Sequence, residues 1–333
     1  AEELRARVAE LTAANAKLAD NLDFERAGRT RAERALRERF LAETGGLGVL
    51  RQIGRISTCF PTRFGTPRQG SLADMSRGVI KLDRTVVAAE SLTGLEAFSH
   101  VWVVFVFHQN TNMHKLAADP SAPLQRKVFP AYIRPPQGGG MRVGLFATRT
   151  PHRPNPIGLS LARIDKVVKN KAELHLRGID LIDDTPILDI KPFVPHVDTP
   201  PADSVKLAPW VVNPAFEAAP VLFTEEARAA TLEICESGGS RWFKPGEGED
   251  LLAAIEQIIS LDPRGVIHGR GTFKDGSGEM PTKSHLVRDS FVLEFDALRI
   301  RFTPHPEDRA ILIRGVERAA SPVAAAGSNT ADA

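Results

Sequence analysis

The feature that most constrains the fold is an uninterrupted run of seven apolar residues, Val101–Phe107. A run of this length suits a fully buried strand and is too short for a typical helix. Shorter apolar segments surround it, and in some of them leucines alternate with polar neighbours, as in half-buried strands. They lie at residues 143–147, 159–161, 174–176, 179–181 and 187–190. Several short strands with little helix between them predict a closed or nearly closed β barrel over residues 49–200.

A heptad pattern precedes the predicted barrel. Two interleaved series repeat every seven residues, Leu4, Leu11 and Leu18 with Val8, Asn15 and Leu22. This pattern predicts a coiled-coil-like helix over residues 1–44, and Asn15 at an a position favours a dimer. A solvated, partly frayed helix is the alternative, because short isolated helices are marginally stable in water.

A proline-rich connector at residues 201–220 follows the barrel and leads to a predicted α+β domain at residues 221–318. Thr224 has the character of a helix start, and residues 251–259 form an amphipathic helical pattern. Strands are expected at residues 266–273, 286–295, 298–303 and 310–316. The Ala/Ser-rich residues 319–333 are predicted to form a disordered tail.

The net charge of +2 on 333 residues conceals a segregation of charge along the chain. Residues 1–44 are neutral, residues 45–200 carry twenty basic and twelve acidic side chains, and residues 201–333 carry fourteen basic and twenty acidic ones. The basic middle segment indicates an anionic partner such as a phosphate backbone. Ordinary scatter of surface charge is the alternative.

Composition excludes several classes of protein. No apolar run approaches the ~20 residues of a membrane span, and two cysteines exclude a disulfide framework. The nine histidines lack the spacing of a metal site, so no metal is expected. Walker A, dinucleotide-binding and Gly-x-Ser-x-Gly motifs are absent. The sequence begins with Ala1, so a targeting peptide would not be visible, and we expect a cytoplasmic protein with an organellar location left open.

Four rigid, polar loops flank the predicted strands. They span residues 65–70, 107–110, 147–158 and 180–192. Three of them have a structural alternative: Arg149 and Arg153 can pair with Asp180 or Asp189, residues 183–186 can form a plain turn, and His108 can be a barrel-rim residue. Four such loops together favour a binding or catalytic site.

These loops resemble those of the TrmO family, also called TsaA-like or YaeB-like. The matching segments are Gly65–Gln69, Gly94–Gln109, Phe146–Leu161 and Asp180–Pro192, and the run Arg149–Gly158 is the most specific of them. The resemblance implies a β-barrel tRNA methyltransferase that uses S-adenosylmethionine to methylate N6 of the threonylcarbamoylated adenosine at position 37, beside the anticodon. It also implies a homodimer. The implied donor-binding residues are Pro67, Arg68, Gln69, His108, Gln109, Arg149, Leu159, Asp183, Asp184, Thr185 and Pro186.

The implied chemistry suggests further residues. Exocyclic N6 is a poor nucleophile, so transfer depends on positioning and on an acceptor that polarises N6–H. We hypothesise that Asp183, Asp184 or Asp189 supplies this acceptor, because the three carboxylates cluster in the sequence. Basic side chains are the candidate phosphate contacts with the tRNA anticodon loop, namely Arg142, Arg153, Arg163 and Lys191.

The chain departs from the family pattern at three places. The family turn usually has Gly before Thr-Pro, where this chain has Asp184. The bacterial Asp-Pro-Arg-Pro-x-Tyr motif is reduced here to Asp262–Arg264, followed by Gly265. The heptad helix lies outside the family core and suggests a coiled-coil partner.

Two other functions remain open from the sequence. One is a non-catalytic module that binds S-adenosylmethionine or RNA, and the other is a coiled-coil adaptor that carries the barrel. Deletion of residues 1–44 separates the adaptor from the enzyme, because only the enzyme is expected to keep its activity.

Overall fold

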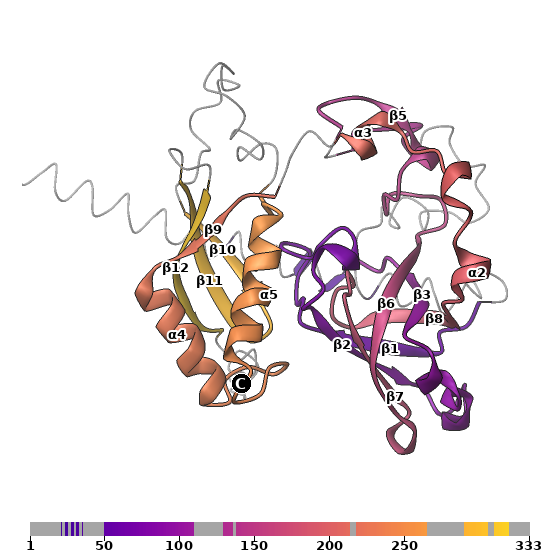
Figure 1. Cartoon of the computed structure of the whole chain (residues 1–333), viewed down its shortest axis with the longest axis horizontal. Helices are drawn as coiled ribbons and strands as arrows, with labels where there is room; N and C mark the ends of the chain where they lie inside the picture. Colours follow the sequence, from indigo (N-terminus) through magenta and orange to yellow (C-terminus); the bar gives the residue numbers. More distant parts are fainter. Residues whose placement is uncertain are drawn as a thin grey trace, which may run out of the picture. The chain divides into compact units, whose positions relative to one another are not determined.

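The computed structural model describes residues 50–109, 129–135, 138–213, 218–264, 290–305 and 310–319, together with scattered positions between 21 and 35 (Figure 1). Close contacts group the chain into two compact units. One contains residues 52–107, 131–150 and 157–333, and all strands and helices named below belong to it. The other contains residues 1–51, 108–130 and 151–156. Most of the predicted heptad helix, residues 110–128, the strand expected at 266–273 and residues 320–333 of the predicted tail lie outside the described residues.

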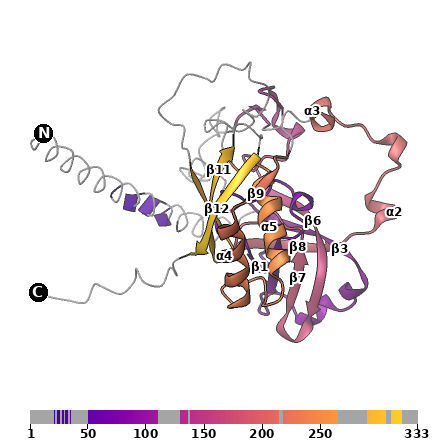
Figure 2. The same ribbon diagram turned by 60° about the vertical axis from the view of Figure 1, so that its left-hand side comes forward.

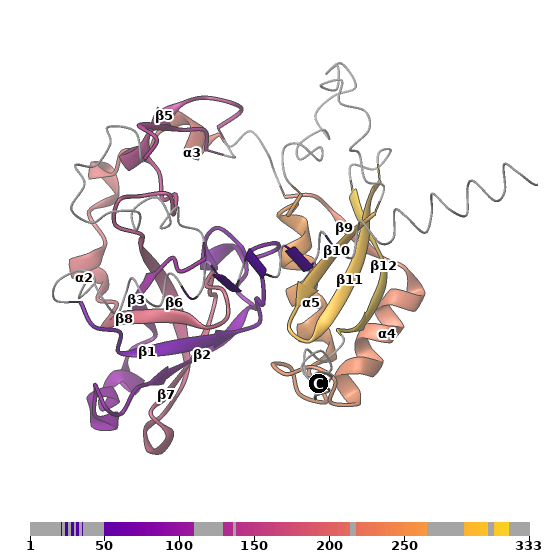
Figure 3. The same ribbon diagram turned by 180° about the vertical axis from the view of Figure 1, so that it is seen from behind.

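Six antiparallel strands close into a barrel (Figures 1 and 3). Around the barrel their order is β1-β2-β7-β6-β3-β8, which returns to β1. The strands are β1 (Gly54–Thr58), β2 (Arg77–Leu82), β3 (His100–Val106), β6 (Ile157–Val168), β7 (Glu173–Arg177) and β8 (Thr185–Pro192). The barrel prediction is therefore confirmed, and the apolar run at 101–107 supplies β3. Closure removes the unpaired edges that an open sheet would expose.

On β6 the barrel interior is not filled by the leucines that alternate in the sequence. On β6 the buried residues are Gly158, Ser160 and Ala162, whereas Leu159 is 54% exposed. Interior space explains this orientation, because a Cβ at position 158 would lie 2.2 Å from the Phe105 ring. The core is made instead by fully buried side chains of the other strands, including Ile56, Ile80, Val103, Leu174, Leu176 and Ile187.

The strand expected at residues 179–181 does not form. The Ile179 amide donates to the Ser76 hydroxyl at 2.8 Å, and that hydroxyl donates to the Ile179 carbonyl at 2.9 Å. Because a side chain takes both backbone groups, they are not available to a sheet ladder. The segment expected at 143–147 is also shorter than predicted, since only β5 (Val143–Gly144) is extended and a 3-10 turn, Leu145–Ala147, follows it.

A short hairpin and an extended connector complete the barrel region. The hairpin pairs β4 (Tyr132–Ile133) with β5. The short helix α2 (Pro195–Asp198) precedes the predicted connector, and the short helix α3 (Pro209–Val212) lies within it (Figure 2). Further 3-10 turns are Gly70–Leu72, Ala89–Leu92, Leu95–Ala97, Lys169–Lys171 and Ala202–Ser204. No helix among the described residues is long and apolar enough to cross a membrane.

Residues beyond the connector contain two helices and a four-stranded sheet (Figure 2). The elements are β9 (Val221–Phe223), α4 (Glu225–Glu236), α5 (Gly248–Ser260), β10 (Phe291–Phe295), β11 (Leu298–His305) and β12 (Ala310–Arg318), with sheet order β10-β11-β12-β9. Thr224 caps α4 by accepting the Ala227 amide at 3.2 Å, and α5 includes the predicted amphipathic segment. That these residues form a separate domain bounded at 221 and 318 stays a prediction.

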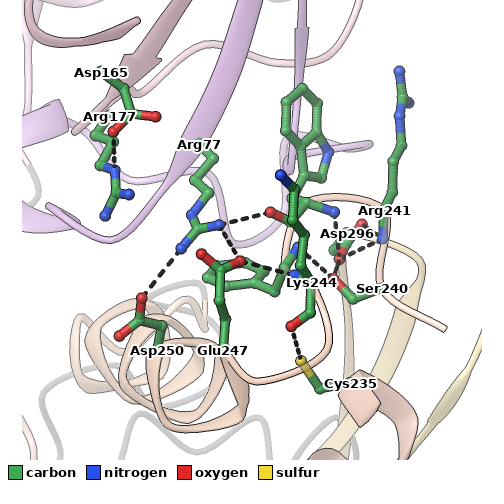
Figure 4. Close-up of polar contacts among 12 residues, drawn as sticks. Arg77, Asp165, Arg177, Cys235, Ser240, Arg241, Lys244, Glu247, Asp250 and Asp296 are labelled. Atoms are coloured by element: carbon green, nitrogen blue, oxygen red, sulfur yellow. Dashed lines mark hydrogen bonds and ion pairs between the residues drawn. The ribbon is translucent and has the colours of Figure 1, made fainter. Parts of the chain in front are cut away.

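Arg77, at the start of β2, contacts this C-terminal region (Figure 4). Its guanidinium lies 2.7 Å from Glu247 and 3.2 Å from Asp250, and it donates to the Trp242 carbonyl at 2.8 Å. The same group lies 4.2 Å from the centroid of the Phe243 ring. Arg77 is only 12% exposed, so its charge is withdrawn from water but surrounded by acceptors.

Candidate active site

Strand direction brings the predicted loops to one end of the barrel. In the antiparallel register Ile56 lies opposite Thr185, Arg77 lies opposite Arg177, and Val106 lies opposite Ile157. The ends of β1, β3 and β7 therefore meet the starts of β2, β6 and β8. The segments at 59–76 and 178–184 leave or enter strands at this end, and β3 ends and β6 begins there, so the topology brings together the loop at 65–70 and the start of the loop at 180–192.

The loop after β1 is closely packed at its base and exposed at its tip. Pro67 is buried, whereas Arg68 and Gln69 reach solvent. The Arg68 guanidinium is still close enough to other atoms that partial desolvation lowers its pKa. At the base, a Cβ on Gly70 would lie 1.9 Å from the Gly178 carbonyl oxygen, so only glycine permits this approach. The loop thus presents a cation and an amide from a fixed backbone.

Asp180 links three of the loops and was not among the predicted site residues. Its carboxylate accepts a hydrogen bond from the Ser160 hydroxyl of β6 and one from the Gly70 backbone. Burial raises its pKa to about 6, and the positive charge of Arg149 opposes part of this rise. The suggested pairing of Arg149 with Asp180 is therefore present as an electrostatic interaction. The sequence offered Asp180 only as a pairing partner of Arg149, because its contacts with Ser160 and Gly70 form only when the barrel closes.

The three candidate catalytic acids have different surroundings. Asp183 Oδ1 accepts the Thr58 amide at 2.7 Å, which ties the turn to the end of β1. Asp184 Oδ2 lies 3.0 Å from Arg55 Nη1. Asp189, further along β8, accepts the amide of Ile190 and lies 3.1 Å from Lys191 Nζ. Only Asp183 and Asp184 stand at the end of the barrel where the loops gather.

The conformation of Asp184 explains how this chain accommodates an aspartate where the family turn usually has Gly before Thr-Pro. Its backbone has φ +63°, a left-handed conformation that glycine adopts freely and that aspartate tolerates better than most residues. Arg55 holds this turn through both the carboxylate and the carbonyl oxygen of Asp184, each at 3.0 Å. The substitution therefore keeps the turn and adds an ion pair.

Other predicted donor-binding residues divide into buried and exposed groups. Thr185 is buried and donates to the Ile182 carbonyl at 2.5 Å, and Pro186 beside it is buried too. Leu159 and Arg149 are exposed. Thr185 and Pro186 therefore shape the turn, whereas Leu159 and Arg149 present side chains to solvent.

His108, Gln109 and Arg153 belong to the smaller unit. His108 and Gln109 follow directly from the end of β3 and are half-buried. The Arg153 amide donates to the Pro151 carbonyl at 2.9 Å, which tightens the proline-rich loop. Their connection to β3 and β6 fixes where these segments leave the barrel.

The basic side chains proposed to contact phosphate lie on different elements, and their role stays a prediction. Lys191 pairs in register with Trp102, and Arg163 with His100, the first residue of β3. Arg142 lies beside the β4–β5 hairpin, with its guanidinium 5.1 Å from the centroid of the Tyr132 ring. All three are exposed.

The residues at the barrel end suit a zwitterionic ligand with an apolar part. Arg68 and Arg149 offer cations for a carboxylate, the turn at Asp183 and Asp184 offers acceptors for an ammonium or hydroxyl, and Leu159 offers an apolar surface. In the part of the chain that the structure describes, no group of three or more His, Cys, Asp or Glu could hold a metal ion. The fold and these loops together define a closed-barrel protein with a candidate small-molecule site at one end.

Comparison with known proteins identifies the family: the chain belongs to the TrmO family. Residues 55–199 match the tRNA-methyltransferase O N-terminal domain. An Escherichia coli relative, named tRNA (adenine(37)-N6)-methyltransferase, is 38% identical over 216 residues, covering 64% of this chain and 80% of the relative. A mouse relative of the same name is 41% identical over 160 residues, covering 47% of this chain.

A solved structure shares the fold. The crystal structure of TrmO from Pseudomonas aeruginosa is 29% identical and aligns with a TM-score of 0.55, covering 80% of this chain and 97% of that one. The mammalian relatives are longer, and the chain spans 33% of the mouse protein. The barrel that the sequence predicted as closed or nearly closed is a closed six-stranded barrel, and it matches the family's structures.

Proposed function

We propose that this protein transfers a methyl group from S-adenosylmethionine to N6 of the threonylcarbamoylated adenosine at position 37 of tRNA. The observation that carries the proposal is the set of contacts of Asp180 at one end of the barrel, where its carboxylate accepts from Ser160 and the Gly70 backbone and interacts with the charge of Arg149. The bacterial relative named for this reaction is matched over 80% of its length, which supports the same assignment here.

The exposed side chains at the barrel end fit the methyl donor. Arg68 and Arg149 suit its carboxylate, the acidic turn at Asp183 and Asp184 suits its ammonium and ribose hydroxyls, and Leu159 suits its adenine. Bound S-adenosylmethionine supplies an electrophilic methyl group. The protein's task is then to orient the acceptor amine and to exclude water, since delocalisation makes N6 a weak nucleophile.

We propose that a carboxylate of the Asp183–Asp184 turn accepts the hydrogen bond from N6–H. Both residues lie in the turn that enters β8 at the barrel end, whereas Asp189 lies within β8. The test is turnover of Asp183→Asn, Asp184→Asn and Asp189→Asn with donor affinity measured alongside. A fall in turnover for one of the first two at unchanged donor affinity is expected, and unchanged turnover in all three removes the hypothesis.

Complementation tests the reaction itself. The full chain is expressed in Escherichia coli lacking the relative with this activity, and tRNA nucleosides are analysed by mass spectrometry. We expect one methyl group to return to the threonylcarbamoylated adenosine at position 37. A chain that binds S-adenosylmethionine but restores no methyl group is a binding module, and this result would overturn the proposal. Tests of tRNA lacking the threonylcarbamoyl group show whether that group is required.

Titration calorimetry tests the donor site separately. Arg68→Ala and Arg149→Ala are each expected to weaken S-adenosylmethionine about tenfold or more, because each removes a charge-assisted hydrogen bond. Arg84→Ala is the matched control, since Arg84 is an exposed barrel arginine whose side chain bonds the Asn170 carbonyl. Equal affinities in all three variants contradict the assigned site.

We propose that the chain forms a homodimer. The connector supports this, because several of its large apolar side chains are exposed, namely Val205, Leu207, Val211 and Val212. Such a concentration is typical of an interaction surface. Light scattering of the full chain and of a variant without residues 1–44 separates two modes of association. If association is lost when residues 1–44 are deleted, the heptad segment holds the two copies together. We also propose that this segment binds a coiled-coil partner.

A further inference from the structure

The β4–β5 hairpin carries exposed apolar side chains. Tyr132, Met141 and Phe146 are 57%, 49% and 75% exposed, and Phe146 is the most exposed large apolar side chain among the described residues. The backbone beneath is held in place. The Leu145 amide donates to the Ala131 carbonyl at 2.9 Å, and the Thr148 hydroxyl donates to the Leu145 carbonyl at 2.8 Å. Leu145 itself is only 7% exposed, so a fixed backbone presents Phe146 to solvent.

The same hairpin is positively charged. Residues 131–149 contain Arg134, Arg142 and Arg149 and no acidic residue. The Arg142 guanidinium lies over the Tyr132 ring, 5.1 Å from its centroid. An arginine stacked on an exposed aromatic ring combines a phosphate-binding cation with a surface for a nucleobase. This combination is typical of single-stranded nucleic-acid sites.

Tyr132 has no side chain opposite it on the neighbouring strand of the hairpin. The cross-strand partner of Tyr132 is Gly144, and a Cβ built on Gly144 meets nothing within 4 Å. A larger residue at position 144 would stand opposite the tyrosine in the position where cross-strand side chains contact one another. Glycine therefore leaves room for a flat ligand beside the ring.

We propose that Tyr132, Arg142 and Phe146 form a stacking platform for unpaired bases of the RNA substrate. The proposal rests on the proposed function and adds where the RNA loop is held. Arg142 and Arg134 meet phosphates, while the two aromatic rings receive bases that are not paired in a helix. Phe146 lies three residues before Arg149, whose charge acts on Asp180, so the platform is continuous in sequence with the candidate site.

The test measures binding of the full chain to an RNA stem-loop with the anticodon-loop sequence and to a blunt duplex of equal charge. Tyr132→Ala and Phe146→Ala are expected to weaken the stem-loop about tenfold each, with little change for the duplex. Tyr132→Phe keeps the ring and stays within about twofold of wild type. Val292→Ala, at another exposed apolar position, is the control and leaves stem-loop affinity unchanged.

Two further variants separate stacking from charge. Gly144→Val fills the space opposite Tyr132 without altering charge and is expected to weaken the stem-loop about fivefold to tenfold. Arg142→Ala is expected to reduce the dependence of the logarithm of affinity on the logarithm of salt concentration by about one unit, whereas Tyr132→Ala leaves that slope unchanged. Thermal unfolding and S-adenosylmethionine binding verify that each variant is folded.

The outcomes distinguish this proposal from the proposed function. Wild-type affinity in Tyr132→Ala, Phe146→Ala and Gly144→Val, in a chain that methylates tRNA, would overturn the platform alone. If these variants bind the stem-loop more weakly than wild type but the chain transfers no methyl group, the platform stands and only the proposed function is overturned. If the aromatic substitutions instead dissociate a dimer and leave RNA affinity unchanged, the hairpin is a contact between two copies of the chain and the proposal is wrong.

Discussion

Arg77 and Asp180 are two charged side chains that are largely shielded from water, and their surroundings stabilise the two charges to different extents. Arg77 lies against two carboxylates, a backbone carbonyl and an aromatic ring (Figure 4). Asp180 receives hydrogen bonds from Ser160 and the Gly70 backbone, while burial still raises its pKa to about 6. Arg77 is compensated by its surroundings, whereas the charge on Asp180 remains costly to the folded state.

This difference indicates that Arg77 stabilises the fold, whereas Asp180 belongs to a functional site. Groups with perturbed pKa values cluster at functional sites. A group whose charged form is disfavoured is therefore expected mainly where the function of the protein requires it. Asp180 lies among the loops of the candidate active site, whereas Arg77 joins β2 to the segment that holds Glu247 and Asp250. We therefore expect substitution of Arg77 to affect stability, and substitution of Asp180 to affect ligand binding.

The largest expected effect is that of Arg77→Met. It leaves the carboxylates of Glu247 and Asp250 and the Trp242 carbonyl without their cation, and the free energy of unfolding is expected to fall by about 2–4 kcal/mol. Because Arg77 lowers the pKa of Glu247, the gap from wild type is present at neutral pH and narrows as the pH falls through that pKa. Urea denaturation at several pH values measures both.

Arg228→Met is the matched control, because its pair with Glu249 is largely exposed at 50% and 72%. A surface pair of this kind contributes at most about 1 kcal/mol. Equal losses in the two variants would remove the distinction between the Arg77 contacts and an ordinary surface ion pair. Donor affinity at the barrel end is expected to stay at the wild-type value in both.

The second prediction concerns the pH dependence that Asp180 contributes. Its folded pKa of about 6 lies above the ordinary value of 3.8, so its contribution to stability is present in acid and is lost as the pH rises from about 4 to about 6. Asp180→Asn removes this dependence. Relative to wild type the variant should gain stability over that interval, by at most about 3 kcal/mol because the carboxyl is partly exposed. A parallel pair of stability–pH curves would contradict it.

The third prediction concerns the function of the same residue. Asp180→Asn keeps an oxygen that accepts from Ser160 but removes the charge that acts on Arg149, so S-adenosylmethionine affinity is expected to fall about tenfold. Titration calorimetry at pH 8 measures this, where wild-type Asp180 is ionised. Asp74→Asn provides a control carboxylate, which lies in the segment between β1 and β2. Unchanged affinity in Asp180→Asn would make Asp180 a purely structural residue.

The sequence predicted the parts of this arrangement that depend on short-range pattern. The run at 101–107 became β3, and the Pro- and Gly-rich loops were recognised because their composition is local. The space inside the barrel depends on residues that are distant in the sequence. Phe105 occupies the space that a side chain at position 158 would need, so Leu159 faces outward. Asp180 was missed for the same reason, since Ser160 and Gly70 reach it only through barrel closure.

The smallest expected effect distinguishes conformation from charge at the Asp184 turn. Asp184→Ala keeps the left-handed φ of +63° but loses the carboxylate that pairs with Arg55, so it should lower the free energy of unfolding by about 1–2 kcal/mol. Asp184→Gly loses the same pair but removes the backbone strain, so it should stay within about 0.5 kcal/mol of wild type. Thermal unfolding of both variants measures the difference. Because this ion pair is about 40% exposed on each side, strain and not charge should dominate, and equal losses in Ala and Gly would show that the ion pair dominates instead.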